Sequence, residues 1–246
     1  MNETRLAALQ QKLASSVHIP PGGSGYQPRQ GDALFSLDAQ YVQDRAYVAL
    51  DAREWEGETL GVFVGVTDVK TPYVPQYFCF REGPPLLAMI RAAQERLSLR
   101  PDLILVDGHG LAHPRRFGLA CWVGVKTGVP TIGCAKQTLL PYNGEVEKKR
   151  GNYLLIEDEN EALGAVLVTQ DDVKPVFISP GHKVGLDVAI QVVLRLAPRY
   201  RIAEPLRRAD QSARACAKGA TLPGVSHLGK VALNDRTENG VEALAG

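Results

Sequence analysis

The hydrophobic pattern of residues 33–67 predicts three consecutive strands. The three stretches are extended, carry many apolar residues and are separated by short polar breaks; they are 33–41, 45–52 and 60–67. Breaks this short favour an antiparallel meander. In the first strand the alternation places Asp38 on the same face as Leu34 and Ser36. Because aspartate is disfavoured in the middle of a strand, we expect Asp38 either to face water or to have a function.

A strand, a helix and a second strand follow. Leu103–Val106 and 131–135 are short apolar runs typical of fully buried strands. Between them we expect a helix that starts at Pro114, since proline suits the first turn of a helix. A βαβ unit of this kind joins parallel strands. Asp107 and Lys136 then both lie at the carboxyl edge of the sheet, where open α/β sheets bind their ligands.

The rest of the pattern predicts a single domain, residues 1–218, followed by a tail. Leucines at helical spacing predict an N-terminal helix at 3–16, and a stretch rich in proline and glycine predicts a linker at 19–32. The core is expected over 33–217. Residues 219–246 lack periodicity, so we expect a weakly ordered C-terminal tail. The other elements expected after the βαβ unit are strands near 153–156, 165–168 and 176–178 and helices at 185–196 and from Glu204 onward.

Composition narrows the class of protein. The chain has 246 residues, 45% of them hydrophobic, which is enough for a substantial core. Its formal net charge is +1, with 28 basic and 27 acidic residues, so any basic surface for nucleic acid must be local. Four widely spaced cysteines form no metal-ligand motif and fit a reducing, cytoplasmic compartment. The N-terminus does not resemble a signal peptide, and no window approaches the roughly 18 apolar residues of a membrane span.

Six ionisable residues stand out by their position in this pattern: Asp38, Glu82, Asp107, His113, Lys136 and His182. Three carboxylates without cysteine ligands suit Mg²⁺ or Mn²⁺ better than zinc. Such a site can align an attacking water and neutralise charge on a phosphate, so it indicates metal-dependent hydrolysis of a phosphodiester bond. Lys136 and a nearby histidine would add positive charge or assist proton transfer.

Ordinary structural interpretations exist for the same residues. Asp107 could close a simple βα turn. Glu82 lies just before the expected start of a helix with apolar positions from Leu86 onward, where an acidic residue is favourable in any case. Asp44 and Asp51 are alternatives to Asp38 as the functional carboxylate of the strand region 33–52. Tyr73, in the stiff segment Pro72-Tyr73-Val74-Pro75, could be a surface residue of a rigid loop.

Several blocks of the chain, in order and at similar spacing between about residues 33 and 210, resemble the endonuclease V family. The longest is Val106-Asp107-Gly108-His109-Gly110-Leu111-Ala112-His113-Pro114-Arg115. The others are Pro72–Pro75, Phe80–Pro84, Gly118–Ala120, Gly128–Gly133 with Ala135-Lys136, and Ser179–His182. The first strand departs from the family pattern, which usually reads Val-Ala-Gly-Val-Asp where this chain has Leu34-Phe35-Ser36-Leu37-Asp38.

The resemblance implies a fold and an activity. The fold would be α/β and ribonuclease-H-like, with a central mixed sheet of an antiparallel meander followed by parallel strands, flanked by helices. The activity would be recognition of inosine in nucleic acid, in DNA repair. The enzyme would hydrolyse the second phosphodiester bond 3′ to the lesion and leave a 3′-hydroxyl and a 5′-phosphate. The cofactor would be Mg²⁺, for which Mn²⁺ can substitute, and we expect a monomer.

The resemblance also assigns roles to residues. The metal-binding carboxylates would be Asp38, Glu82 and Asp107, with Lys136, His182 and His113 also lining the active site. Pro72, Tyr73, Val74 and Pro75 would form a wedge, with Tyr73 filling the gap that the extruded base leaves. The base pocket would use main-chain groups of Gly83, Gly108, His109, Gly110 and Leu111, because glycine lets a backbone approach a flat base.

Three other functions remain compatible with the sequence. The enzyme could act mainly on inosine in RNA, since contacts to a 2′-hydroxyl cannot be recognised in a sequence. A catalytically idle module could bind damaged strands without cutting them, and the unusual first strand keeps this alternative open. A small-molecule phosphohydrolase could use the same metal site, although the wedge would then have no purpose.

Overall fold

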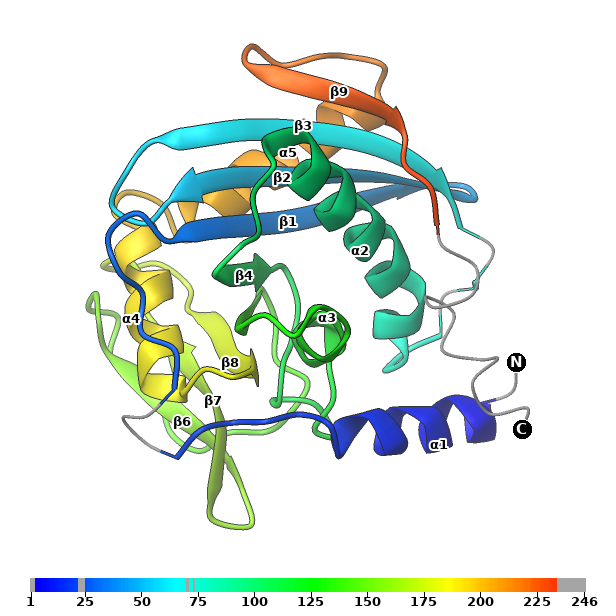
Figure 1. The fold of residues 1–246 in the computed structure, drawn as a ribbon. Coiled ribbons are helices and arrows are strands. Elements are labelled where there is room, and N and C mark those ends of the chain that lie inside the picture. The colour runs from blue at the N-terminus through cyan, green and yellow to red at the C-terminus, as the bar shows by residue number, and fades with distance from the viewer. Residues whose placement is uncertain (1–2, 22–24, 70, 73, 234–246) are drawn as a thin grey trace.

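A computed structural model describes residues 3–21, 25–69, 71–72 and 74–233. The part of the chain that it covers forms one nine-stranded mixed sheet, in the order β6-β7-β8-β5-β4-β1-β2-β3-β9 (Figure 1). The strands are β1 (Ala33–Val42), β2 (Arg45–Glu54), β3 (Thr59–Asp68), β4 (Leu103–Val106), β5 (Thr131–Ala135), β6 (Tyr153–Asp158), β7 (Glu161–Leu167), β8 (Val176–His182) and β9 (Val225–Lys230).

The central strands have the predicted directions. β1, β2 and β3 form the antiparallel meander, and β1, β4 and β5 run parallel to one another. Beyond β5 the sheet turns antiparallel again, because β8 pairs antiparallel with β5 and is followed outward by β7 and β6. The carboxyl ends of β1, β4 and β5 therefore lie at one edge of the sheet, while β8 ends at the opposite edge.

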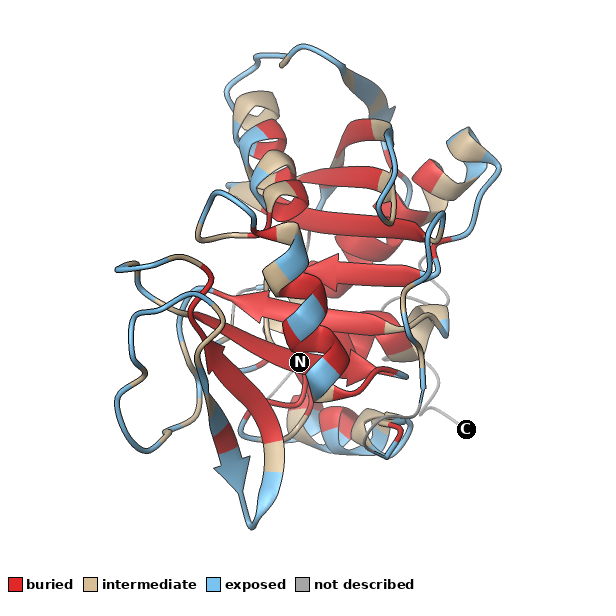
Figure 2. Cartoon of the chain, turned by 90° about the vertical axis from the view of Figure 1, so that its left-hand side faces the viewer, coloured by how far each residue is buried: buried red, intermediate tan, exposed pale blue. Residues whose placement is uncertain are grey.

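Helices cover both faces of the sheet (Figure 1). They are α1 (Glu3–Ala14), α2 (Phe78–Leu97), α3 (Leu119–Thr127), α4 (Leu186–Leu196) and α5 (Glu204–Ala217). One hydrophobic cluster joins α1, α2 and α3 to one face, and two others join α4 and α5 to the opposite face. The central strands are buried along most of their length, whereas the hairpin tips are exposed (Figure 2).

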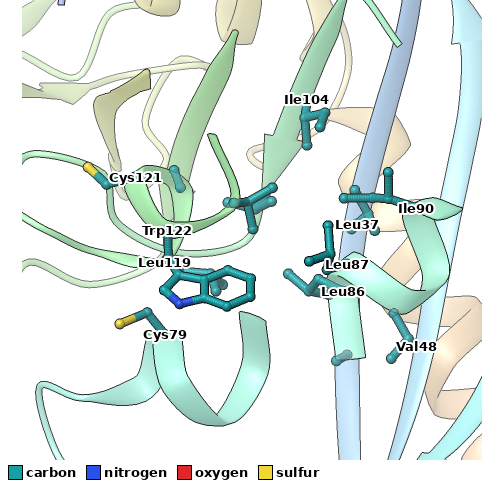
Figure 3. Close-up of a cluster of buried hydrophobic side chains, with 14 of the residues drawn as sticks. Leu37, Val48, Cys79, Leu86, Leu87, Ile90, Ile104, Leu119, Cys121 and Trp122 are labelled. Atoms are coloured by element: carbon teal, nitrogen blue, oxygen red, sulfur yellow. The ribbon is translucent and has the colours of Figure 1, made fainter. Parts of the chain in front are cut away.

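The alternation along β1 determines what its residues face. Phe35 and Leu37 belong to the cluster under α2 and α3, whereas Leu34 belongs to the cluster on the α4 side. Asp38, four residues after Leu34, therefore points to the face that α4 and α5 cover. On the other face Trp122 of α3 points towards Leu86 and Leu87 of α2 (Figure 3). This packing holds α2 and α3 against each other on this face of the sheet.

Two helix starts differ from the prediction. α3 begins at Leu119 and not at Pro114. Its first amides are satisfied by the preceding loop, since Gly118 N donates to Gly110 O (3.0 Å) and Ala120 N to His109 O (2.9 Å). Residues 107–118 are therefore a folded loop, and His113 does not lie at the helix N-terminus. α2 begins at Phe78, so Glu82 lies within the helix and is not a residue that precedes it.

The C-terminal expectation is corrected for one segment. Residues 225–230, predicted to belong to a weakly ordered tail, form β9 and pair in parallel with β3. Val231, just beyond this strand, is buried in the cluster under α2. Residues 234–246 lie outside the described part of the chain. Within that part, no helix is both long and apolar enough to cross a bilayer.

Candidate active site

Asp38, Asp107 and Lys136 lie side by side at the carboxyl edge of the sheet. Leu37 pairs with Val106 and Val106 with Gly133, so the ends of the three parallel strands are in register. Asp107 follows β4 directly and its amide donates to Leu37 O (3.3 Å). Lys136 follows β5 directly, and its Nζ forms an ion pair with Asp107 Oδ2. The prediction from the βαβ pattern is thus confirmed for this pair.

Glu82 brings a further carboxylate from α2. Its side chain is buried, and burial raises the pKa of Glu82 well above its usual range, with the charges of Asp38 and Asp107 adding to the effect. Burial likewise raises the pKa of Asp38, helped by Asp107 and opposed by Lys136. Burial alone would lower the pKa of Lys136, but the charges of Asp107 and Asp38 raise it above its ordinary value. These groups act on one another electrostatically and form a single cluster.

Asp210 of α5 is a further carboxylate of this cluster, and the sequence analysis did not single it out. Its Oδ1 accepts a hydrogen bond from Gln40 Nε2 (3.4 Å), and Gln40 lies on the same face of β1 as Asp38. Its charge raises the pKa of Asp38 and of Lys136. Arg214 pairs with Asp210 one helical turn on (2.9 Å). In the sequence, that i,i+4 pair is typical of a solvated helix surface, which hides the role of the aspartate.

The competing aspartates lie elsewhere. Asp51 is fully buried in β2, but Arg53 binds both of its oxygens (2.8 and 2.9 Å), so its charge is already compensated. Asp44 is exposed in the turn between β1 and β2, where it lines a separate open hollow of about 630 Å³. The structure therefore favours Asp38 as the carboxylate of the first strand.

The donor set fits a hard divalent cation. Oxygen ligands from several carboxylates are what Mg²⁺ prefers. Glu82 Oε2 is buried and has no hydrogen-bond partner among the described residues, which leaves one carboxylate oxygen available. In the described residues as they stand, no three Asp, Glu, His or Cys side chains are close enough together to hold an ion. The Lys136 ammonium on Asp107 supplies positive charge at this point of the cluster.

A pocket of about 440 Å³ adjoins Asp107 and Lys136. Gly108 and His109 form part of its wall, together with Gln76, His113 and the segment that follows β5. His113 is buried, and burial lowers its pKa to about 4, with the charge of Arg115 adding to the shift. Apart from Asp107 and Lys136, the residues of the pocket are thus uncharged at pH 7, and most of them are apolar or glycine.

Three of the backbone positions expected at a base pocket have other tasks. A Cβ on Gly83 would lie 2.4 Å from the ring of Trp122, so this glycine permits the packing of α2 on α3. A Cβ on Gly110 would lie 2.0 Å from Pro180 O, and Leu111 N donates to that carbonyl (2.8 Å). The residues from Gly110 onward thus pack against β8. Only Gly108 and His109 of the predicted set line the pocket.

His182 does not join the carboxylates. It is the last residue of β8 and pairs with Thr131 at the start of β5, whereas Lys136 follows the other end of that strand. Five residues of strand separate the two by roughly 15 Å. His182 Nδ1 accepts a hydrogen bond from His18 N (3.2 Å), and burial lowers its pKa. The expectation that His182 lines the active site is therefore corrected, because β8 runs antiparallel to β5.

The predicted wedge lies beside the pocket. Val74 is half-buried and Pro72 and Pro75 are exposed, while Tyr73 lies outside the described residues. Gln76, which follows directly, lines the pocket.

The sequence matches a family of known proteins. The family model described as Endonuclease V matches residues 26–211. An endonuclease V of Geotalea uraniireducens is 50% identical over 206 residues, which cover 83% of this chain and 84% of the relative. One of Streptomyces coelicolor is 40% identical over 225 residues, 89% of this chain and 92% of the relative.

The chain belongs to the endonuclease V family.

Solved endonuclease V structures share the fold. The enzyme of Streptomyces avermitilis has a TM-score of 0.77 at 36% identity, covering 89% of this chain and 94% of that one. The catalytic domain of human endonuclease V has a TM-score of 0.79 at 28% identity, with 89% and 98% covered. A variant of the Ciona intestinalis endonuclease V, with a TM-score of 0.77 at 25% identity and 89% and 99% covered, was solved with a 23mer DNA containing an inosine followed by a ribo-adenosine. The predicted fold class is confirmed.

Proposed function

We propose that this endonuclease V family member is a metal-dependent endonuclease that recognises inosine in DNA. It would hydrolyse the second phosphodiester bond 3′ to the lesion and leave a 3′-hydroxyl and a 5′-phosphate, in DNA repair. The observation that carries the proposal is the position of the Asp38–Glu82–Asp107 cluster and Lys136 directly beside a pocket lined by Gly108 and His109. The inosine-containing DNA bound by the Ciona relative supports the choice of lesion.

We assign a task to each charged residue of the cluster. Asp38, Glu82 and Asp107 would hold Mg²⁺, or Mn²⁺ in its place, with Asp210 as a further neighbour. When bound, the ion supplies positive charge for the scissile phosphate and lowers the pKa of a water. Lys136 keeps a proton on Nζ at pH 7 and can stabilise negative charge on the phosphate as it builds up. Arg201 holds this residue in place, because its Nη2 donates to Lys136 O (3.0 Å).

The pocket would receive the extruded base. Away from Asp107 and Lys136, its uncharged and partly apolar wall suits an uncharged purine better than a phosphate group. His113 would act as a neutral hydrogen-bonding residue in this wall and not as a cation. Pro72, Val74 and Pro75 would stiffen the wedge and Tyr73 would fill the gap in the stack. Unstacking a base costs about a few kcal/mol, part of which an inserted ring recovers.

The test is a nicking assay on a duplex that carries one inosine, with and without Mg²⁺. We expect metal-dependent cutting near the inosine and no cutting of the matched plain duplex. Asp107→Asn should lower the rate by a factor of about 100 or more, and Asp210→Asn by about 10 or more, because each removes negative charge from the cluster. Glu204→Gln is the matched control, because Glu204 is on α5 and pairs only with exposed Arg199 among the bonds described (3.1 Å).

The outcomes separate the alternatives. Binding of the inosine duplex without cutting would favour an idle binding module. Equal cutting of the plain duplex would contradict lesion specificity.

A second candidate is an inosine-specific endoribonuclease. It is favoured by the ribo-adenosine that follows the inosine in the DNA bound by the Ciona relative. Placing one ribonucleotide 3′ to the inosine in the same duplex tests it. A large gain in rate would assign the protein to RNA.

A further inference from the structure

The carbonyl of Gln76 is bound by three side chains that all lie far from it in the sequence. Gln10 Nε2 donates to it (3.3 Å), and so does Arg115 Nη2 (3.0 Å). His113 Nε2 lies 3.0 Å away, and since its Nδ1 accepts from Arg115 N (3.2 Å), Nε2 carries the proton and donates. Gln76 is a wall residue of the pocket beside Asp107. One carbonyl at the pocket wall thus connects α1 with the loop that follows β4.

Gln10 is the unusual member of this set. It is a polar residue of α1 that is fully buried, as Leu6 and Leu9 of the same helix are, and it contacts the loop before α3. Burying an amide is unfavourable unless its groups find partners. Here Nε2 also donates to Phe117 O (2.6 Å), and Oε1 accepts from Arg115 Nε. A leucine would serve equally well if α1 only needed to dock.

Arg115 completes the arrangement. Besides its bonds to Gln10 and to the Gln76 carbonyl, its Nη1 donates to Gln76 Oε1 (3.1 Å). Its guanidinium also stacks over the Tyr77 ring, with Cζ 4.2 Å from the ring centroid. We refer to Gln10 and Arg115, with their bonds to Gln76, as the Gln76 clamp.

The backbone of Gln76 needs such support. Its φ is +67°, in the left-handed region that residues other than glycine adopt infrequently. A conformation of this kind persists where the surroundings hold it, and it is common at ligand sites. The side chain of Gln76 is exposed, so packing of the side chain does not provide the restraint. The restraint comes from the three donors that bind its carbonyl.

The other end of the same segment is held in a similar way. Arg81 Nη1 donates to Thr71 O (2.5 Å), and the Arg81 guanidinium stacks over the Tyr41 ring at 4.8 Å. The segment Pro72–Pro75 is therefore preceded and followed by a carbonyl that an arginine binds.

We infer that the Gln76 clamp makes α1 a specificity element of the lesion pocket. Gln10 and Arg115 are positioning residues: they fix the Gln76 wall, and with it the end of the segment that precedes it, in the conformation that accepts the extruded base. The inference rests on the proposed function for the identity of the ligand. Without the clamp, the protein would lose discrimination between inosine and normal DNA while the carboxylate cluster keeps its geometry.

The first test measures the clamp without any nucleic acid. Gln10→Met keeps the length and apolar packing of the side chain and removes its polar bonds, and Gln11→Met is the matched control because Gln11 is exposed on the same helix. Amide hydrogen exchange at Tyr77, whose N donates to Val74 O (3.1 Å), reports the state of the pocket wall. We expect exchange at Tyr77 to be faster by a factor of about five or more in Gln10→Met only. Equal exchange at Tyr77 in the two variants would contradict the proposed role of the Gln76 clamp, and this result does not depend on the activity of the protein on DNA.

The second test measures discrimination. Single-turnover cutting at increasing protein concentration gives a half-saturating concentration and a maximal rate for the inosine duplex, and a filter-binding titration gives the affinity for the plain duplex. For Gln10→Met we expect the half-saturating concentration to rise by about fivefold to tenfold, with the maximal rate and plain-duplex affinity unchanged. Arg115→Lys, which keeps the charge but not the fork of donors, should behave in the same way.

Each contrary result has one meaning. Equal losses on both duplexes, together with a lower melting temperature, would show that Gln10 only docks α1 and would overturn the inference. A wild-type protein that does not distinguish the inosine duplex from the plain duplex would contradict the proposed function. It would also contradict the role of α1 in lesion specificity. The exchange test would still decide whether the clamp orders Gln76.

Discussion

Burial keeps the two imidazoles of the pocket wall uncharged. Burial lowers the pKa of His109 to about 4, and burial together with the charge of Arg115 lowers that of His113 to about 4. The carboxyl groups of Asp38 and Glu82 have the opposite shift, since burial raises their pKa. The part of the pocket that the two imidazoles form is therefore uncharged at neutral pH, whereas the Asp107–Lys136 ion pair lines another part of it. This division matches a ligand with a neutral base and an anionic backbone.

The shift at His113 predicts a pH dependence of stability. Its pKa is about 4 in the folded protein and about 6.5 in the unfolded chain, so protons bind the unfolded chain first as the pH falls. The contribution of His113 is fully present above pH 6.5 and is lost between about pH 6.5 and 4. Replacing the ring by an amide in His113→Gln removes this contribution. We expect the loss of unfolding free energy between those pH values to be smaller by up to about 3 kcal/mol in the variant.

Urea unfolding of both proteins at a series of pH values measures this difference. Other buried groups titrate in the same window, and comparing the two proteins cancels them. Parallel curves for the wild type and the variant would contradict the prediction, because they would show that His113 binds its proton at the same pH in the folded and the unfolded protein.

At the scale of elements, the start of α3 determines the shape of the site. Gly118 has an extended backbone, with φ −94° and ψ −168°, and precedes the first residue of the helix. The loop folds back on it so closely that a Cβ at this position would lie 2.2 Å from His109 O. This approach lets the carbonyls of His109 and Gly110 bind the first amides of α3. The pocket wall and the helix start thus depend on one another.

Gly118→Ala should therefore destabilise the protein by about 2–3 kcal/mol, because the clash is with backbone that cannot move away. The matched control is Gly185→Ala at the start of α4, where the backbone is also extended and the near neighbour is the mobile Asp187 carboxylate (2.6 Å). We expect the control to lose about 0.5–1 kcal/mol. Chemical denaturation measures both losses. If the two were equal, the close packing of the loop on Gly118 would not contribute to stability.

Local pattern predicted the elements better than their ends and directions. Alternation along β1 and the apolar runs of β4 and β5 located the parallel strands and put Asp107 beside Lys136. The start of α3 was wrong because Pro114 has the chemistry of a first helical turn, whereas the carbonyls that cap the helix come from a fold of the loop. His182 was misplaced for a similar reason. Its strand is antiparallel to β5, and strand direction depends on the long connection between them.

Residues that act through distant contacts were also missed. Asp210 reaches the cluster only because α5 crosses β1, a contact 170 residues away in sequence from Gln40. Gln10 looks like any polar residue of an amphipathic helix until its partners 66 and 105 residues away are known. No local signal marks either of them.

At the scale of the whole molecule, the site lies at the ends of the central strands, whereas β9 is an outermost strand of the sheet. Asp38 lies in β1, and Asp107 and Lys136 directly follow β4 and β5. β2 and β3 separate β1 from β9. Of the residues after α5, Val231 is buried, and it packs under α2 with Met89 nearby. The C-terminal segment should therefore affect stability far more than activity.

A chain that ends at Lys218 tests this separation. Losing the burial of Val231 and the pairing of β9 should lower the unfolding free energy by about 2–3 kcal/mol. The maximal rate of cutting should stay within about twofold, because the removed strand does not contact the strands of the site. Thermal melting and single-turnover cutting at a low temperature measure the two effects. A large loss of rate in the folded, shortened protein would show that this segment contributes to the site.

The placement of the carboxylates on the middle strands has a consequence for how such a protein can diverge. The hairpin of β6 and β7 on one side and β9 on the other are outer strands, so insertions there need not move β1, β4 or β5. Related proteins can therefore lengthen, shorten or change the surface of these outer strands while the carboxylates keep their positions. For protein engineering, the tip of the β6–β7 hairpin, where Glu159 and Asn160 are exposed, is accordingly the place to graft an affinity tag or a second domain.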